Sequence, residues 1–107
     1  MCGIAGYHGK NIAPAKAATY LGRMVVALRH RGPDAEGVLV RGDTGLAHTR
    51  LSIVGLADGA QPMTREDAGL AVSFNGEIFN YVELRDDLKA RGHRFRTGSD
   101  TEVLLAA

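Results

Sequence analysis

The sequence has little that could cross-link a fold. Its single cysteine, Cys2, excludes a disulfide within the chain, and no set of Cys and His residues has the spacing of a zinc site. The 13 Lys and Arg residues nearly balance the 12 Asp and Glu residues and are scattered among them, which argues against a nucleic-acid-binding surface. We therefore predict no metal site and no nucleic-acid partner.

Long hydrophobic runs are missing as well. No stretch of about 18 apolar residues is present to span a bilayer, and the N-terminus lacks the basic and hydrophobic regions of a signal peptide. We expect no membrane association and a cytoplasmic location. The rest of the composition, 45% hydrophobic and 23% charged with 14 glycines, is typical of one small globular domain with many tight turns.

The first half of the chain predicts a strand, a helix and a hairpin. An apolar run directly after Cys2 is typical of a strand, and a helix is expected between Pro14 and the Gly32–Pro33 pair. Two extended runs flank a turn at residues 42–45, which predicts an antiparallel hairpin. The apolar face of the predicted helix consists of Leu21, Met24, Val25 and Leu28.

The second half is expected to begin with a polar loop (57–69), a strand (70–74) and a helix (78–92). Asn80 and Glu83 have the spacing of a capping box, and Gly92 stands where a helix commonly ends. A short strand (93–97) and the start of a third helix should follow, with Ser99 or Asp100 as the N-cap.

The position of Cys2 raises a chemical question. Aminopeptidases usually remove an initiator methionine that precedes a small residue, so Cys2 would become the N-terminus and carry both a thiol and a free α-amine. Because that amine has an unperturbed pKa of about 7.7–8, it can accept the proton of the thiol. The alternative from position alone is a small buried hydrophobic residue, the usual use of a free cysteine. The four histidines stand in contexts that indicate no chemistry.

Six motifs occur in one order and together carry a specific resemblance. They are "MCGIAG", "LRHRGPD", "RLSIVGL", "QPM", "NGEIFNY" and "TGSDTEVLL". Residues 2–107 resemble the glutaminase domain of glutamine-hydrolysing asparagine synthetases, which belong to the class II amidotransferases among the N-terminal-nucleophile hydrolases. Each motif is weak by itself, but the full set in this order is typical of that family.

The resemblance implies an α+β fold, the N-terminal-nucleophile hydrolase αββα sandwich, of which residues 1–107 form only the N-terminal half. The expected unit is thus a partial class II glutamine amidotransferase domain, with the remaining glutaminase and synthetase regions absent. No cofactor is expected here, whereas ATP and Mg²⁺ are expected in the absent synthetase domain. The implied partners are L-glutamine and the C-terminal synthetase domain, and a homodimer stays open.

The resemblance also assigns catalytic roles. Cys2 is implied to attack the side-chain amide of glutamine, forming a γ-glutamyl thioester and releasing ammonia. The side chain of Asn75 and the backbone N–H of Gly76 are implied to stabilise the oxyanion. From the residues alone, Asn75–Gly76 is equally a common turn dipeptide, and a turn can serve both purposes.

Substrate binding follows in the same way. Arg50 is implied to hold the α-carboxylate of glutamine, for which a guanidinium is well shaped, and Glu77 and Asp100 its α-ammonium. Without the resemblance, Arg50 reads as a solvated strand residue and Asp100 as a helix cap. Further pocket positions implied by the family are Leu51, Ile53 and Val54, and the segment 31–34 is expected to shape a loop near the site.

The predicted function is glutamine hydrolysis that supplies ammonia for ATP-dependent synthesis of asparagine from aspartate. Three alternatives stay open. The domain could belong to an amidotransferase of the same family with a different acceptor. It could be a non-hydrolytic scaffold, as in β-lactam synthetase-like proteins, or a module that binds glutamine without hydrolysing it.

Overall fold

The computed structural model describes residues 1–51 and 59–107. Helices and antiparallel strands are mixed, in agreement with the predicted α+β class. The elements in chain order are β1 (Gly3–His8), α1 (Pro14–Leu28), β2 (Ala35–Arg41), β3 (Thr44–Arg50), β4 (Met63–Arg65), the 3-10 turn η1 (Glu66–Ala68), β5 (Leu70–Val72), α2 (Tyr81–Ala90) and α3 (Asp100–Ala106).

The larger sheet has the order β1-β3-β2, and both pairings are antiparallel. Strand β3 lies in the centre because the predicted hairpin pairs it with β2 and because β1 adds to its free edge. The hairpin is confirmed, but its turn is shorter than predicted, since Thr44 already pairs with Arg41. Gly42 provides the positive φ (53°) that such a tight turn favours.

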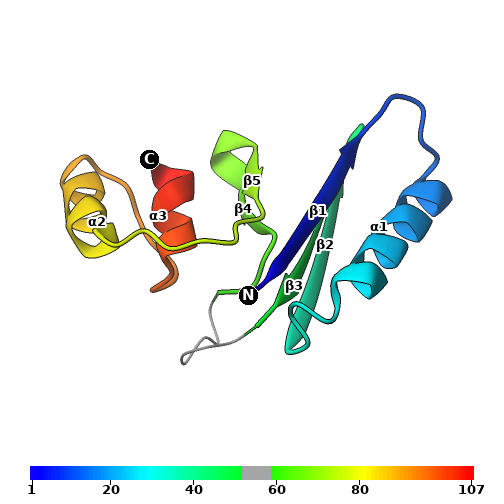
Figure 1. Ribbon diagram of the computed structural model, residues 1–107. Coiled ribbons are helices and arrows are strands. Elements are labelled where there is room, and N and C mark those ends of the chain that lie inside the picture. The colour runs from blue at the N-terminus through cyan, green and yellow to red at the C-terminus, as the bar shows by residue number, and fades with distance from the viewer. Residues whose placement is uncertain (52–58) are drawn as a thin grey trace.

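Helix α1 covers one face of this sheet and forms the main apolar core with it (Figure 1). Pro14 occupies the first turn, where its missing N–H costs nothing. The predicted apolar face is confirmed, because Leu21 and Val25 are buried against Ala47 of β3 while Met24 packs beside them. Alternation along β3 directs Ala47 and Thr49 toward α1, so His48 and Arg50 lie on the opposite face.

The hairpin β4–β5 stands beside that opposite face. Its first strand lies inside the segment expected to be a polar loop, and its second covers only three of the five residues predicted as strand. The turn η1 connects them and ends at Gly69, which has a φ of 64°. Arg41 at the end of β2 forms an ion pair with Glu66 and so joins the hairpin to the larger sheet.

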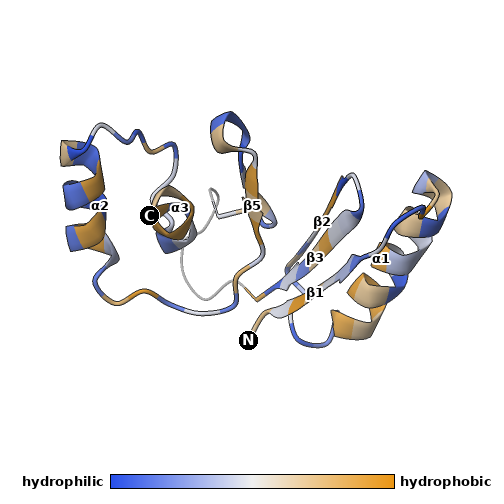
Figure 2. Ribbon diagram, turned by 90° about the horizontal axis from the view of Figure 1, so that it is seen from above, coloured by the Kyte–Doolittle hydropathy of each residue, from blue (hydrophilic) through white to orange (hydrophobic). Residues whose placement is uncertain are grey.

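The two C-terminal helices complete the row of layers, with α3 next to the hairpin and α2 outermost (Figure 2). Helix α2 begins after Asn80, so residues 78–80 of the segment expected to be helical (78–92) precede it, and the predicted capping box is wrong. The backbone of Asn80 (φ −97°, ψ 31°) is not extended, and its side chain makes no capping hydrogen bond. The predicted end is confirmed, since Gly92 has a φ of 96° and the His93 N–H donates to the Leu88 carbonyl at 3.0 Å.

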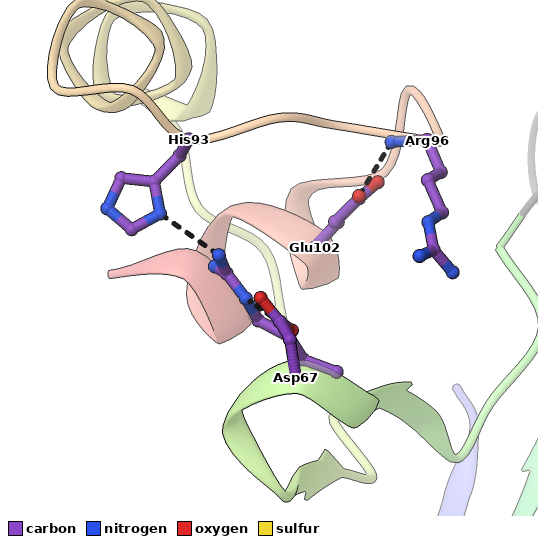
Figure 3. Close-up of polar contacts among 5 residues, drawn as sticks. Asp67, His93, Arg96 and Glu102 are labelled. Carbon is purple, nitrogen blue, oxygen red and sulfur yellow. Dashed lines mark hydrogen bonds and ion pairs between the residues drawn. The ribbon is translucent and has the colours of Figure 1, made fainter.

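The expected strand at 93–97 is absent from the structure, because these residues bond to side chains instead. The backbone N–H of Arg96 donates to the carboxylate of Glu102 at 2.7 Å (Figure 3). The Thr97 N–H donates to the same carboxylate at 2.7 Å, and Arg65 approaches His93 Nδ1 at 3.2 Å. Ser99 is the N-cap of α3, with its Oγ accepting from the Thr101 N–H at 3.1 Å. Asp100 is therefore the first helical residue and not the cap.

The described residues form an elongated body of 43 × 29 × 18 Å. The radius of gyration is 14.7 Å, against about 13 Å for a compact domain of this length. Valines on the edge strand β2 stay exposed on the helix-covered face, Val38 by 57% and Val40 by 46%. No helix among the described residues is long and apolar enough to cross a membrane.

Candidate active site

A cavity of about 660 Å³ opens between the larger sheet and the C-terminal layers. Every predicted site residue that the structure describes lines this cavity, although the residues come from four separate segments of the chain. They are Cys2, Arg50, Leu51, Asn75, Gly76, Glu77 and Asp100. The other two predicted positions, Ile53 and Val54, lie outside the described residues.

Cys2 is placed by the strand that follows it. Because Gly3 pairs with Thr49, the residue before it lies beside the end of β3, where Leu51 follows. The Leu51 N–H donates to the sulfur of Cys2 at 3.4 Å, and the Arg31 side chain donates to the Cys2 carbonyl at 3.3 Å. The half-buried thiol also donates to the Leu51 carbonyl at 4.0 Å, so the backbone of Leu51 holds the sulfur in place from both its N–H and its carbonyl.

The segment 31–34 packs against the end of β3, in agreement with the expectation that it shapes the site. A Cβ on Gly32 would lie 2.4 Å from the backbone of Thr49, so only glycine permits this approach. The Asp34 N–H donates to the Arg50 carbonyl at 2.9 Å. Arg31 contacts Cys2 and Asp34 contacts Arg50, so the segment 31–34 fixes these two site residues relative to each other.

Arg50 directs its side chain toward the cavity from the last position of β3. Its guanidinium lies close to Gly59, where a Cβ would stand 2.7 Å from Nη2. Among the residues that the structure describes, no carboxylate forms an ion pair with Arg50. A half-buried arginine in this state is available to an anionic ligand group.

The loop after β5 contributes Asn75, Gly76 and Glu77. Its backbone is fixed by Gln61, whose Oε1 accepts from the Phe74 N–H at 2.6 Å and whose Nε2 lies 3.3 Å from the Thr101 hydroxyl. Gly76 passes so close to the Phe74 ring that a Cβ would lie 2.7 Å from it. The sequence contains Gln61 in a motif but gave no indication of this bridging role.

Asp100 joins the same loop from the other side. Its Oδ2 accepts from the Ile78 N–H at 3.0 Å, directly after the Asn75–Glu77 turn. Because Ser99 caps the helix, the carboxylate of Asp100 is not needed for that purpose. The cavity therefore carries an arginine near one end of the site and carboxylates of Asp100 and Glu77 near the turn.

His48 is the cavity residue that the sequence analysis missed. Its side chain is only 1% exposed, and its Nδ1 lies 2.9 Å from the Ser73 hydroxyl. Burial lowers the pKa of His48 below its ordinary value, and the charge of Arg50 lowers it further. The available signal was its place two residues before Arg50 in a strand, which puts both side chains on one face.

The glutamine amidotransferase domain family matches residues 1–107, and the chain belongs to this family. It is 43% identical to asparagine synthetase [glutamine-hydrolyzing] 1 of Bacillus subtilis over 99% of its length, and 47% identical to the Arabidopsis thaliana protein of that name over 97%. A probable asparagine synthetase [glutamine-hydrolyzing] of Dictyostelium discoideum is 44% identical over 98%. The chain spans 17%, 18% and 19% of these three relatives, respectively.

These comparisons confirm the resemblance found in the sequence. They also confirm that the domain is of an enzymatic, amidotransferase type. The roles of the individual cavity residues stay predictions.

Proposed function

We propose that this domain hydrolyses L-glutamine to glutamate and ammonia with Cys2 as the nucleophile. The observation that carries the proposal is the single cavity that gathers a thiol, an arginine without a carboxylate partner among the described residues, an Asn-Gly turn and two carboxylates. Membership of the amidotransferase family supports it independently.

In the proposed reaction, removal of Met1 frees the α-amine of Cys2. That amine takes the thiol proton, and the thiolate attacks the side-chain amide carbon of glutamine. The tetrahedral intermediate collapses when the amine returns the proton to the leaving nitrogen, which departs as ammonia. Water then attacks the γ-glutamyl thioester, releases glutamate and restores the thiol. The Leu51 N–H directed at the sulfur supports this role, since a thiolate accepts hydrogen bonds better than a thiol.

The oxyanion of both tetrahedral intermediates would be stabilised by the Asn75 side chain and the Gly76 N–H. The turn that carries them is held by Gln61 on one side and by Asp100 on the other. Such preorganisation matters, because a donor that is already in place costs no rearrangement when the charge develops. Loss of one donor of this kind typically reduces kcat by about 10²–10³.

Recognition of free glutamine would use the charges at the two ends of its backbone. Arg50 would bind the α-carboxylate, and Asp100 with Glu77 would bind the α-ammonium. A peptide-bound glutamine lacks both charges, so this arrangement selects the free amino acid. Leu51, Ile53 and Val54 are proposed to line the same pocket.

The wider reaction is proposed from the relatives. The ammonia would serve ATP-dependent formation of asparagine from aspartate in a linked synthetase region, where ATP and Mg²⁺ would bind. We also infer that the complete fold is an αββα sandwich of which this chain is one part. The exposed Val38 and Val40 support this inference, since they leave part of the helix-covered face of the sheet open to a further helix beside α1.

The test uses 6-diazo-5-oxo-norleucine, a glutamine analogue that alkylates such thiols. We expect the intact mass of the purified full-length protein to show loss of Met1 and one adduct on Cys2, suppressed by excess glutamine. Ammonia release should disappear in Cys2→Ala. Glutamine binding without ammonia release in the wild type would contradict the proposal and favour a binding module.

Arg50 can be tested with a matched control. Arg50→Lys should raise KM for glutamine by about tenfold, because an ammonium cannot make the two-pronged contact of a guanidinium. Arg41→Lys changes the same residue type on the neighbouring strand β2, outside the cavity, and should leave KM unchanged. If the two substitutions changed KM for glutamine equally, Arg50 would have no specific role in binding the substrate.

A further inference from the structure

His48 is a buried polar residue of the cavity that the proposed reaction does not use. It lies on the same face of β3 as Arg50, while its neighbour Thr49 points to α1 and donates to the Leu28 carbonyl. With 1% exposure, its two ring nitrogens need partners inside the protein. Only Nδ1 has one among the described residues, and the buried Nε2 does not.

The hydrogen bonds around Ser73 decide which ring nitrogen carries the proton. The Ser73 hydroxyl is directed at the Ala47 carbonyl at 3.4 Å, which is longer than an ordinary O–H···O bond, and it lies 2.9 Å from Nδ1 of His48. With its single proton toward Ala47, the hydroxyl oxygen accepts from Nδ1. We therefore assign the neutral Nδ1–H tautomer, which leaves Nε2 as an unprotonated acceptor. The lowered pKa of His48, caused by burial and by Arg50, agrees with a neutral ring.

Ser73 is two residues before Asn75, and the segment between them is held at two points. The Phe74 N–H donates to Gln61, and the Ser73 hydroxyl bonds to His48. No hydrogen bond of the Asn75 side chain is present within the described part of the chain, so its direction depends on the backbone that leads to it. Both partners of the Ser73 hydroxyl, the ring of His48 and the Ala47 carbonyl, come from β3, which also places Arg50.

We propose that His48 is a positioning residue: its Nδ1–H···Ser73 hydrogen bond fixes the segment that presents Asn75 and Gly76 to the reacting amide. This inference rests on the proposed glutaminase function. The contacts proposed for the α-ammonium have a separate support, because Asp100 accepts from the Ile78 N–H beyond the turn. Loss of the His48 bond should therefore lower kcat and leave KM nearly unchanged.

Two substitutions of His48 test the roles of its two ring nitrogens separately. An asparagine amide can occupy the place of Nδ1, and a glutamine amide reaches that of Nε2. In the full-length protein we expect His48→Asn to keep kcat within about threefold of wild type, while His48→Gln and Ser73→Ala each lower it about tenfold. KM for glutamine should change by less than about twofold in all three. The double variant H48Q/S73A should be no slower than S73A alone, because Ser73→Ala already removes the bond to His48 together with the contact to the Ala47 carbonyl.

Several outcomes would overturn the proposal. If His48→Gln is active and His48→Asn is not, Nε2 and not Nδ1 makes the contact on which activity depends, which contradicts the proposal. If kcat falls in step with the thermal midpoint in every variant, or if the two losses add in the double variant, the role is structural. The ¹⁵N shifts of the His48 ring give a readout without activity, and a proton on Nε2 at neutral pH would contradict the assignment. A wild-type protein that releases no ammonia from glutamine would instead show that the proposed function itself is wrong.

Discussion

The two halves of the molecule are stabilised differently. Helix α1 and the sheet β1-β3-β2 are joined by an apolar core around Leu21 and Val25, and this half carries Cys2 and Arg50. The part from Gln61 to α3 also buries Leu88, Val103 and Leu105, but several of its backbone N–H groups donate to side chains instead of to other backbone groups. The accepting side chains are Gln61, Asp100 and Glu102. The cavity lies where the two parts meet, so the proposed nucleophile Cys2 lies on the first part and the Asn75–Gly76 turn, proposed to bind the oxyanion, lies on the second.

Removal of the central core side chain should give the largest effect. Leu21→Ala deletes a side chain that is 1% exposed, and we expect the free energy of unfolding to fall by about 2–5 kcal/mol. Val26→Ala, on the exposed side of the same helix, should change it by less than about 0.5 kcal/mol. Urea titrations followed by circular dichroism measure both values. Similar losses in the two variants would mean that α1 is not anchored by this core.

The polar half should be more sensitive to acid. Burial raises the pKa of Glu102, but hydrogen bonds from the Thr97 hydroxyl and from the N–H groups of Arg96 and Thr97, with the charge of Arg85, outweigh it and lower the pKa. A carboxyl whose pKa is lower in the folded state stabilises the fold above its ordinary value of 4.5, and this contribution is lost as the pH falls through the folded value.

Glu102→Gln should therefore reduce the free energy of unfolding by about 1–2 kcal/mol at neutral pH and by less in acid. Urea titrations at about pH 7 and about pH 4 measure the difference. Asp86→Asn, an exposed carboxylate on α2, serves as the control and should change the free energy by less than about 0.5 kcal/mol. A loss from Glu102→Gln that is the same at both pH values would contradict the role of its charge.

The smallest expected effect compares two helix caps within the polar half. Ser99→Ala removes a side chain that accepts from the Thr101 N–H, and about 1 kcal/mol should be lost. Asn80→Ala removes an N-cap side chain that makes no such bond, so the loss should be only a few tenths of a kcal/mol. Hydrogen exchange of peptides from α2 and α3 measures each helix separately. Equal loss of protection in the two helices would contradict the prediction that the hydrogen bond made by the N-cap side chain determines the loss of stability.

Periodicity in the sequence was sufficient for the first half of the fold. Helix α1 and the hairpin β2–β3 have long apolar patterns, and such patterns report directly on which face is buried. The three-residue strand β4 is too short to have a pattern. The segment 93–97 has the composition of a strand but no partner, because Glu102 takes its N–H groups. Its conformation depends on a contact that no local rule contains.

The candidate site also contains residues that the sequence indicates and residues that only the structure shows. The family resemblance carried by the motifs was needed to name Cys2 and Asn75, because from residue type and position alone Cys2 fits a buried hydrophobic residue and Asn75 a turn. The roles of His48 and Gln61 arise from contacts with Ser73 and Phe74, which are 25 and 13 residues away. Residues that support a site through one distant hydrogen bond leave no signature in a single sequence.

Gly37 has no side chain and takes no part in the proposed reaction, yet its position tolerates no other residue. A Cβ at this place on β2 would lie 1.8 Å from the carbonyl oxygen of Gln61, the residue that holds the Phe74 N–H. Any side chain there would displace Gln61 and, through it, the turn that carries Asn75. Gly37 therefore matters to the turn that carries Asn75 through the absence of a side chain, which leaves room for the Gln61 carbonyl.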